Sequence, residues 1–101
     1  MRKQLSTAVL GLALITGAVS GARAEMPSPV VLANTCFSCH WTDGHSAGAM
    51  PSLNGKPAAY ISTMLTAYRS DAKKGTVMNR IAKGVSQDEI KALSQYFAAK
   101  K

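Results

Sequence analysis

The chain has 101 residues and a formal net charge of +7 at pH 7, with 12 Lys and Arg against five Asp and Glu. This length accommodates one small domain. The positive charge suits an acidic partner. Nucleic-acid binding is not expected, because the sequence has neither an arginine-rich helix nor a series of aromatic residues on which bases could stack.

The first 24 residues have the pattern of a secretory signal peptide. Met1–Lys3 is positively charged, residues 5–19 carry no charge, and small residues at Ala22 and Ala24 have the spacing of a signal-peptidase site. An uncleaved anchor is the alternative, but the apolar stretch is short for a membrane span. We therefore expect cleavage after Ala24, a periplasmic location and a mature domain of residues 25–101 without a membrane span.

The mature domain needs something to complete its core. It retains 77 residues, with nine Lys and Arg and five Asp and Glu, a net charge of +4. Domains of this size usually depend on disulfides, a metal or another cross-link. The two cysteines give at most one disulfide around a very short loop, which would restrict the unfolded chain little.

Three helices are predicted, and no segment has the alternating pattern of a strand, so the expected fold class is all-α. The first helix covers about residues 29–35, with Pro29 suited to an early helical position. The second covers about residues 57–69. Its apolar residues recur at helical spacing: Ile61, Leu65 and Tyr68, flanked by Tyr60 and Met64.

The third helix has the clearest signature. Ser86 and Glu89 match a capping box. Ile90, Leu93 and Phe97 follow at positions i, i+3 and i+7 and predict one apolar face.

Residues 41–56 and 70–85 are predicted to be the two connections between these helices. Both are rich in Gly, Ser, Asn and Pro. Loops this long in a small domain usually wrap a ligand or are disordered.

The segment CFSCH, residues 36–40, contains both cysteines and allows three kinds of site. A redox disulfide of this spacing is expected after a strand in a βαβ unit, and no strand is predicted here. A zinc site would use Cys36, Cys39, His40 and His45. However, Cys39 and His40 are adjacent, whereas zinc ligand pairs are separated by a longer loop, and exported thiols tend to oxidise.

The third alternative, covalent haem, explains the most observations. C-x-x-C-H is the attachment signature of c-type haem. Cys36 and Cys39 lie one helical turn apart and can form thioethers with both vinyl groups of one porphyrin, and His40 is then held beneath the iron as an axial ligand. A haem would also complete the small core and give the long loops a group to wrap. We therefore predict one covalently attached haem c.

An electron-carrying haem normally has a second axial ligand, and methionine opposite histidine raises the reduction potential. Met78 is favoured, because it lies 38 residues after His40 and has ample chain to reach the far face. The other candidates lie beside the cleavage site (Met26), within the apolar stripe of the second helix (Met64) or within ten residues of His40 (Met50 and His45).

Four segments, CFSCHWTDG, AMPSLNGKPAAYI, TVMNRIAKG and SQDEIKALSQYF, are together similar to small class I cytochromes c. The chain most resembles the haem subunit of flavocytochrome c sulfide dehydrogenase, along nearly its whole mature length. The resemblance implies three main helices and long loops wrapped around one haem. It also implies that Leu93, Tyr96 and Phe97 contact the haem where the first and third helices cross, that the Pro51 carbonyl accepts a hydrogen bond from His40, and that Met78 binds the iron.

The resemblance further implies a carrier of single electrons that performs no bond-making chemistry itself. Its electron donor would be the FAD-containing flavoprotein subunit of a sulfide dehydrogenase. The alternative is a free shuttle between respiratory or photosynthetic redox partners. Lysines in or beside the expected haem loops could guide docking to an acidic partner: Lys56, Lys73, Lys74 and Lys83.

Trp41 departs from the resemblance, because these cytochromes usually have glycine after the haem histidine. Its ring would pack along the haem edge or belong to a partner surface. Tyr60, Asn79 and Arg80 would either bond to the haem propionates or the methionine sulfur, or face water.

Overall fold

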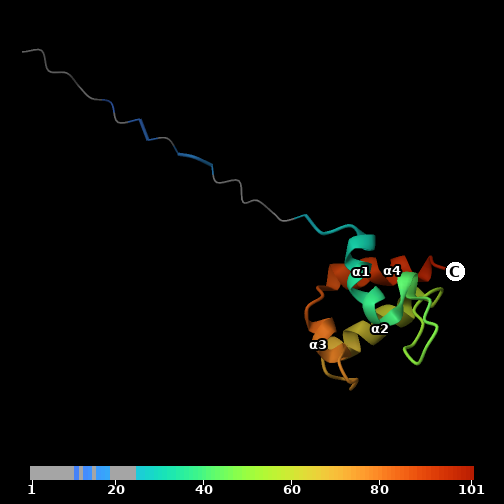
Figure 1. The fold of residues 1–101 in the computed structure, drawn as a ribbon. Coiled ribbons are helices and arrows are strands. Elements are labelled where there is room, and N and C mark those ends of the chain that lie inside the picture. The colour runs from blue at the N-terminus through green and yellow to red at the C-terminus, as the bar shows by residue number, and fades with distance from the viewer. Residues whose placement is uncertain (1–10, 12, 15, 19–24) are drawn as a thin grey trace, which may run out of the picture.

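The fold is described by a computed structural model that covers residues 11, 13–14, 16–18 and 25–101. Most of the predicted signal peptide, including its charged start and its cleavage site, lies outside the described residues. No described residue lies in a strand, and the all-α prediction is confirmed. The helices are α1 (Pro29–His40), the 3₁₀ helix η1 (Thr42–Gly44), α2 (Ala58–Arg69), α3 (Met78–Lys83) and α4 (Gln87–Ala98) (Figure 1).

Helix α1 is longer than the sequence pattern predicted. It continues past Thr35 and ends at His40, so the prediction that it stops near Thr35 is wrong. The last turn closes when the Trp41 N–H donates to the Phe37 carbonyl at 2.9 Å. Small and polar side chains in this half do not give an apolar periodicity, although they are compatible with a helix: the Ser38 hydroxyl donates back to the Thr35 carbonyl at 3.1 Å.

Helices α2 and α4 agree with the prediction. Helix α2 begins one residue after Pro57 and ends at Arg69. The capping box of α4 is confirmed: the Glu89 N–H donates to the Ser86 hydroxyl at 3.2 Å, and the Ser86 N–H donates to Glu89 Oε1 at 3.0 Å.

The connection at residues 70–85 contains a helix that the sequence analysis treated as loop. Helix α3 has six residues and begins at Met78, with no side-chain cap at Val77. A helix this short has little stability of its own, so its existence depends on tertiary contacts. It packs against α2.

The core forms where α1, α2 and α4 meet. Helix α4 packs against both α1 and α2, as Figure 1 shows. Ala33, Ile61, Leu93 and Phe97 are buried in one cluster. The Phe97 ring meets the Phe37 ring edge-on at 6.3 Å between centroids, a favourable aromatic arrangement. The expected packing of the first predicted helix against the last is present.

Gly44 fixes the path of the chain after α1. Its φ of 78° suits glycine. A Cβ at this position would lie 2.8 Å from Leu53 Cβ and 3.1 Å from Phe97 Cδ1. The Gly44 carbonyl accepts the Leu53 N–H at 2.9 Å. The segment after His40 is therefore held against the loop at residues 51–54 and against α4.

Candidate cofactor site

The two cysteines lie on the last turns of α1, three residues apart, and both are free thiols. Residues three apart on a helix lie on neighbouring parts of its surface, so continuous helix brings the two sulfur atoms to the same side. Cys36 is half-buried and Cys39 is exposed. Burial raises the pKa of the Cys36 thiol above its ordinary value, partly opposed by the contact with the Thr35 hydroxyl. Redox-active cysteines have lowered pKa values, so Cys36 does not have the character of one.

His40, the last residue of α1, is buried, with 7% of its surface exposed. Its Nδ1 lies 2.6 Å from the Pro51 carbonyl oxygen. A carbonyl oxygen can only accept, so Nδ1 carries the hydrogen, and in the neutral imidazole Nε2 then carries a lone pair. The contact expected from the resemblance is therefore present.

Nε2 of His40 has no hydrogen-bond partner, although it is buried. A buried polar atom without a partner is costly and calls for an explanation. A metal ion is the natural partner of an imidazole nitrogen whose opposite nitrogen donates to a carbonyl. The residues present fit a haem: two thiols on one helix side and a buried imidazole nitrogen directly after them.

Met78 stands on a different part of the fold from His40. It is half-buried and is the first residue of α3, not a loop residue as the sequence analysis placed it. His40 belongs to the pair α1 and α4, whereas α3 packs on α2. A group bound by both residues would be held by α1 and by α3.

The other ligand candidates occupy varied positions. Met64 is half-buried within α2, whereas Met50 and Met26 are exposed, with 37% and 46% of their surfaces accessible. His45 is exposed. In the described part of the chain, no three His, Cys, Asp or Glu side chains gather into a group that could hold a metal ion, so Cys36, Cys39, His40 and His45 do not form one.

Trp41 has a backbone conformation that explains why glycine is usual at its position in the cytochromes that the chain resembles. Its φ is 69° and its ψ is 166°, a region populated almost only by glycine. The side chain is 51% exposed. The tryptophan is thus held in a strained backbone with about half of its surface in contact with solvent.

Tyr96 is tied to the segment after the C-x-x-C-H motif. Its hydroxyl donates to Asp43 Oδ1. This hydrogen bond, followed by burial and the negative charge of Asp43, raises the pKa of Tyr96 to about 12. The Lys100 ammonium lies 4.5 Å from the centroid of the ring. The Asp43 contact has no local signal in the sequence, because the partners are 53 residues apart.

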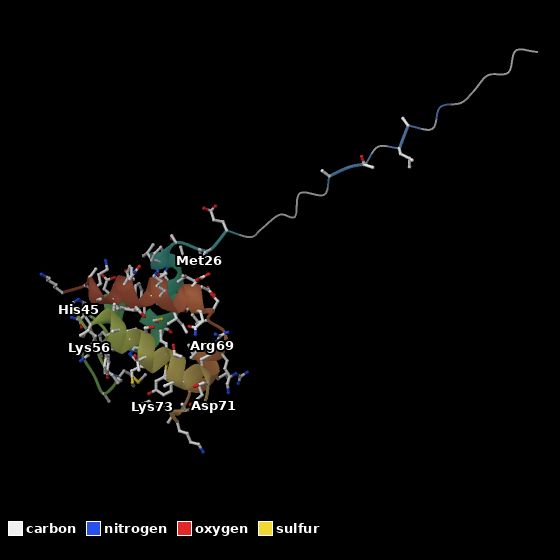
Figure 2. The ribbon with its side chains drawn as sticks, turned by 180° about the vertical axis from the view of Figure 1, so that it is seen from behind. Met26, His45, Lys56, Arg69, Asp71 and Lys73 are labelled. Atoms are coloured by element: carbon white, nitrogen blue, oxygen red, sulfur yellow. The ribbon has the colours of Figure 1, made fainter. Side chains whose placement is uncertain are left out.

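The lysines expected to guide docking differ in their surroundings. Lys56 and Lys73 lie at separate places on the domain (Figure 2). Lys83 is already paired with Asp71 at 2.6 Å.

Tyr60, Arg80 and Asn79 were the residues with an open role near the haem. Tyr60 is half-exposed beside Lys56, and Arg80 is exposed. Asn79 bonds instead to the loop before α3.

No helix in the described ranges combines the length and the apolar character that crossing a membrane requires.

Residues 28–99 match the family model for cytochrome c. The chain is 40% identical over 67 residues to the cytochrome subunit of sulfide dehydrogenase from Chlorobaculum tepidum, covering 66% of this chain and 61% of that protein. It is 35% identical over 69 residues to cytochrome c-554(548) from Halomonas halodenitrificans, covering 64% and 83%.

A third relative is the thiosulfate dehydrogenase electron acceptor of Thiomonas intermedia, 32% identical over 100 residues that cover 97% of this chain and 44% of that protein. The chain thus spans less than two thirds of the Chlorobaculum and Thiomonas proteins. The family match covers most of residues 25–101 and includes Cys36, Cys39 and His40, which fit the C-x-x-C-H motif. The chain therefore belongs to the cytochrome c family, whose members carry covalent haem c.

Proposed function

We propose that Cys36 and Cys39 would form the two thioethers of haem c, and that His40 and Met78 would be the ligands of its iron. The observation that carries this assignment is the buried Nε2 of His40, which has no other partner. When bound, the haem supplies reversible one-electron chemistry, and its axial ligands and their hydrogen bonds set the potential.

The residues of the chain hold this site rigid. The Pro51 carbonyl accepts the Nδ1 hydrogen of His40 at 2.6 Å, which fixes the orientation of the ring and makes Nε2 a stronger donor. Gly44 holds the loop that contains Pro51 through its carbonyl. Rigid ligands favour electron transfer, because little structure needs to move when the charge changes.

The proposed role is that of a haem subunit that accepts single electrons from a flavoprotein sulfide dehydrogenase in the periplasm. The named relative from Chlorobaculum tepidum supports this role. The positive net charge of residues 25–101 would favour docking to an acidic surface on the partner protein. The proposal includes removal of Met1–Ala24 as a signal peptide. The likeness to the Thiomonas electron acceptor, over 97% of this chain, supports a free electron carrier as the second candidate.

Replacing Met78 with alanine tests the proposed ligand set. We expect Met78→Ala to keep its covalent haem but to bind carbon monoxide readily in the ferrous state, because the sixth position is open. Met64→Ala is a matched control on α2. Unchanged axial ligation in Met78→Ala, read from the visible spectrum, would remove Met78 from the site.

The partner is tested by gel filtration of the native protein from its own organism, with haem and flavin absorbance recorded across the fractions. We expect flavin and haem to co-elute in constant ratio, well above the size of the 77-residue domain. A second run at high salt reports how much of the association depends on exposed charges. Haem that elutes alone as a small monomer in both runs would contradict the subunit role and favour the free carrier.

A further inference from the structure

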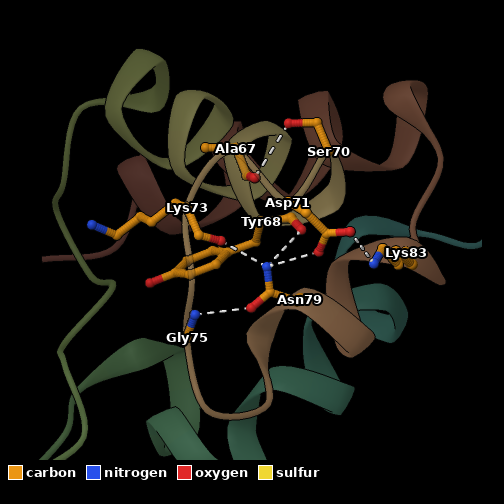
Figure 3. Close-up of polar contacts among 8 residues, drawn as sticks. All are labelled: Ala67, Tyr68, Ser70, Asp71, Lys73, Gly75, Asn79 and Lys83. Carbon is orange, nitrogen blue, oxygen red and sulfur yellow. Dashed lines mark hydrogen bonds and ion pairs between the residues drawn. The ribbon is translucent and has the colours of Figure 1, made fainter.

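The side chain of Asn79 joins four residues of the preceding segment (Figure 3). Its Nδ2 donates to the Lys73 carbonyl at 2.7 Å, and to the Tyr68 carbonyl and Asp71 Oδ1, both at 3.1 Å. Its Oδ1 accepts the Gly75 N–H at 2.8 Å. A single amide therefore bonds to the end of α2 and to most of the loop that follows it.

Asp71 gives this network a second connection. It has a φ of 62°, in the left-handed region, and its carboxylate also accepts from the Lys83 ammonium at 2.6 Å. Both of these side chains are more than half exposed. An exposed ion pair contributes little by itself, so the amide of Asn79 is the main tie between the loop and α3.

The segment that Asn79 holds lies against Met78. A methyl group placed on Gly75 would lie 3.0 Å from Tyr68 Cε1 and 3.5 Å from Met78 Cβ. The exposed Gly75 thus lies next to both the Tyr68 ring and Met78. If the hydrogen bond from the Gly75 N–H to Asn79 is lost, the part of the loop that lies beside Met78 is free to move.

Helix α3 cannot hold Met78 in place unaided. It has six residues, and no side chain caps its start at Val77. Isolated helices of this length are unstable in water. The position of its first residue must therefore be fixed by contacts with the rest of the domain, and those of Asn79 are the nearest in sequence.

We infer that Asn79 is the positioning residue for Met78, acting through the segment at residues 68–75 without touching the iron itself. The inference rests on the proposed role of Met78 as an iron ligand. It differs from the expectation that Asn79 bonds to the methionine sulfur or a propionate, because both ends of its amide are engaged by the loop.

The experiment compares three variants of the haem-loaded protein: Asn79→Ala, Asp71→Ala and Ser86→Ala. Asn79→Ala removes all four hydrogen bonds, and Asp71→Ala removes one of them together with the Lys83 pair. Ser86→Ala is the matched control, because loss of a helix cap destabilises the fold without touching this loop.

The first measurement is the rate at which carbon monoxide binds to the ferrous protein, since carbon monoxide takes the position only when Met78 leaves. We expect a rate at least about tenfold higher in Asn79→Ala, because the loss of one average hydrogen bond already changes an equilibrium by about fivefold. Asp71→Ala should give a smaller increase, and Ser86→Ala less than about twofold. The sulfur-to-iron absorption of the ferric protein should weaken in the same order.

The second measurement is hydrogen exchange at the Gly75 amide, which reports the loop without reference to the haem. We expect faster exchange in Asn79→Ala than in Ser86→Ala. Equal exchange and equal carbon monoxide rates in these two variants would overturn the inference. If Asn79→Ala does not fold, Asp71→Ala takes its place, and its hydrogen exchange and carbon monoxide rate are compared with those of Ser86→Ala.

Met78→Ala, measured in parallel, separates the two proposals. Slow carbon monoxide binding in Met78→Ala would refute Met78 as the ligand and the positioning role with it. Fast binding in Met78→Ala together with wild-type behaviour in Asn79→Ala would refute only the positioning role of Asn79.

Discussion

Trp41 carries the clearest local strain in the described part of the chain. Its φ of 69° and ψ of 166° fall in a region that costs a residue with a side chain about 1–3 kcal/mol. Two hydrogen bonds enforce it: the Trp41 N–H donates to the Phe37 carbonyl, and the Trp41 carbonyl accepts the Gly44 N–H, both at 2.9 Å. The end of α1 and the start of η1 thus dictate a conformation suited to glycine.

Trp41→Gly is expected to stabilise the protein by about 1 kcal/mol. Relief of the strain outweighs the greater entropy that glycine gives the unfolded chain. The measurement is guanidinium unfolding of the haem-loaded protein. Trp41→Ala is the control, because it removes the ring but keeps a Cβ at the strained position. A glycine variant that is less stable than the alanine variant would show that the backbone is not strained there, because only the entropy cost of glycine would then remain.

Residues close together in the sequence were the easiest part of the proposed site to predict. The chemistry of Cys36, Cys39 and His40 depends on spacing alone, and the structure places them on one helix end. The contact between His40 and Pro51 followed from the resemblance and not from any pattern in the residues. The role of Asn79 could not be predicted, because its partners are mainly backbone groups whose positions depend on the finished loop.

The predicted helices succeeded where apolar residues recur or a cap is present. Ser86 and Glu89 predicted the start of α4 correctly. The second half of α1 and all of α3 lacked such signals: residues 36–40 are mainly small or polar, and α3 is short and uncapped. These segments are helical because of what they pack against, which a local pattern does not report.

The hydrogen bond from Tyr96 to Asp43 links α4 to η1 and should make stability depend on pH in the alkaline range. The pKa of Tyr96 is raised to about 12 in the folded protein, against about 10 for an unperturbed tyrosine. A raised pKa of this kind contributes stability that is fully present below about pH 10 and is lost as the pH rises through about 12.

We expect wild type to lose stability relative to Tyr96→Phe between about pH 10 and about pH 12, because only wild type has this hydroxyl to ionise. Urea unfolding of both proteins across that range gives the measurement. Tyr60→Phe, which removes a hydroxyl from a half-exposed ring on α2, is the control. Parallel pH profiles for wild type and Tyr96→Phe would refute the coupling.

At the scale of the whole molecule, the buried protein core is small. The buried apolar residues of the described chain include few large side chains: Ile61, Ile90, Leu93 and Phe97. A domain of this size seldom folds stably on its own core. We therefore expect the covalent haem to stabilise the fold in addition to its proposed role in electron transfer.

Replacing both cysteines by alanine tests that dependence. We expect the Cys36→Ala, Cys39→Ala double variant to hold no haem after denaturation. Its thermal midpoint should fall by more than about 10 °C, since a loss of about 2 kcal/mol shifts a small domain by that amount. Haem absorbance of the denatured chain and circular dichroism provide the measurements. Haem that stays attached in the double variant would contradict the attachment sites.

The hydrogen bond of His40 also bears on how such a protein can evolve. Its acceptor is the main-chain oxygen of Pro51, so no single side-chain replacement deletes it. In the proposed site, Met78 is held through the side chain of Asn79, which one codon change can remove. Natural variation should therefore leave the histidine side of the haem nearly constant and adjust the reduction potential mainly from the methionine side.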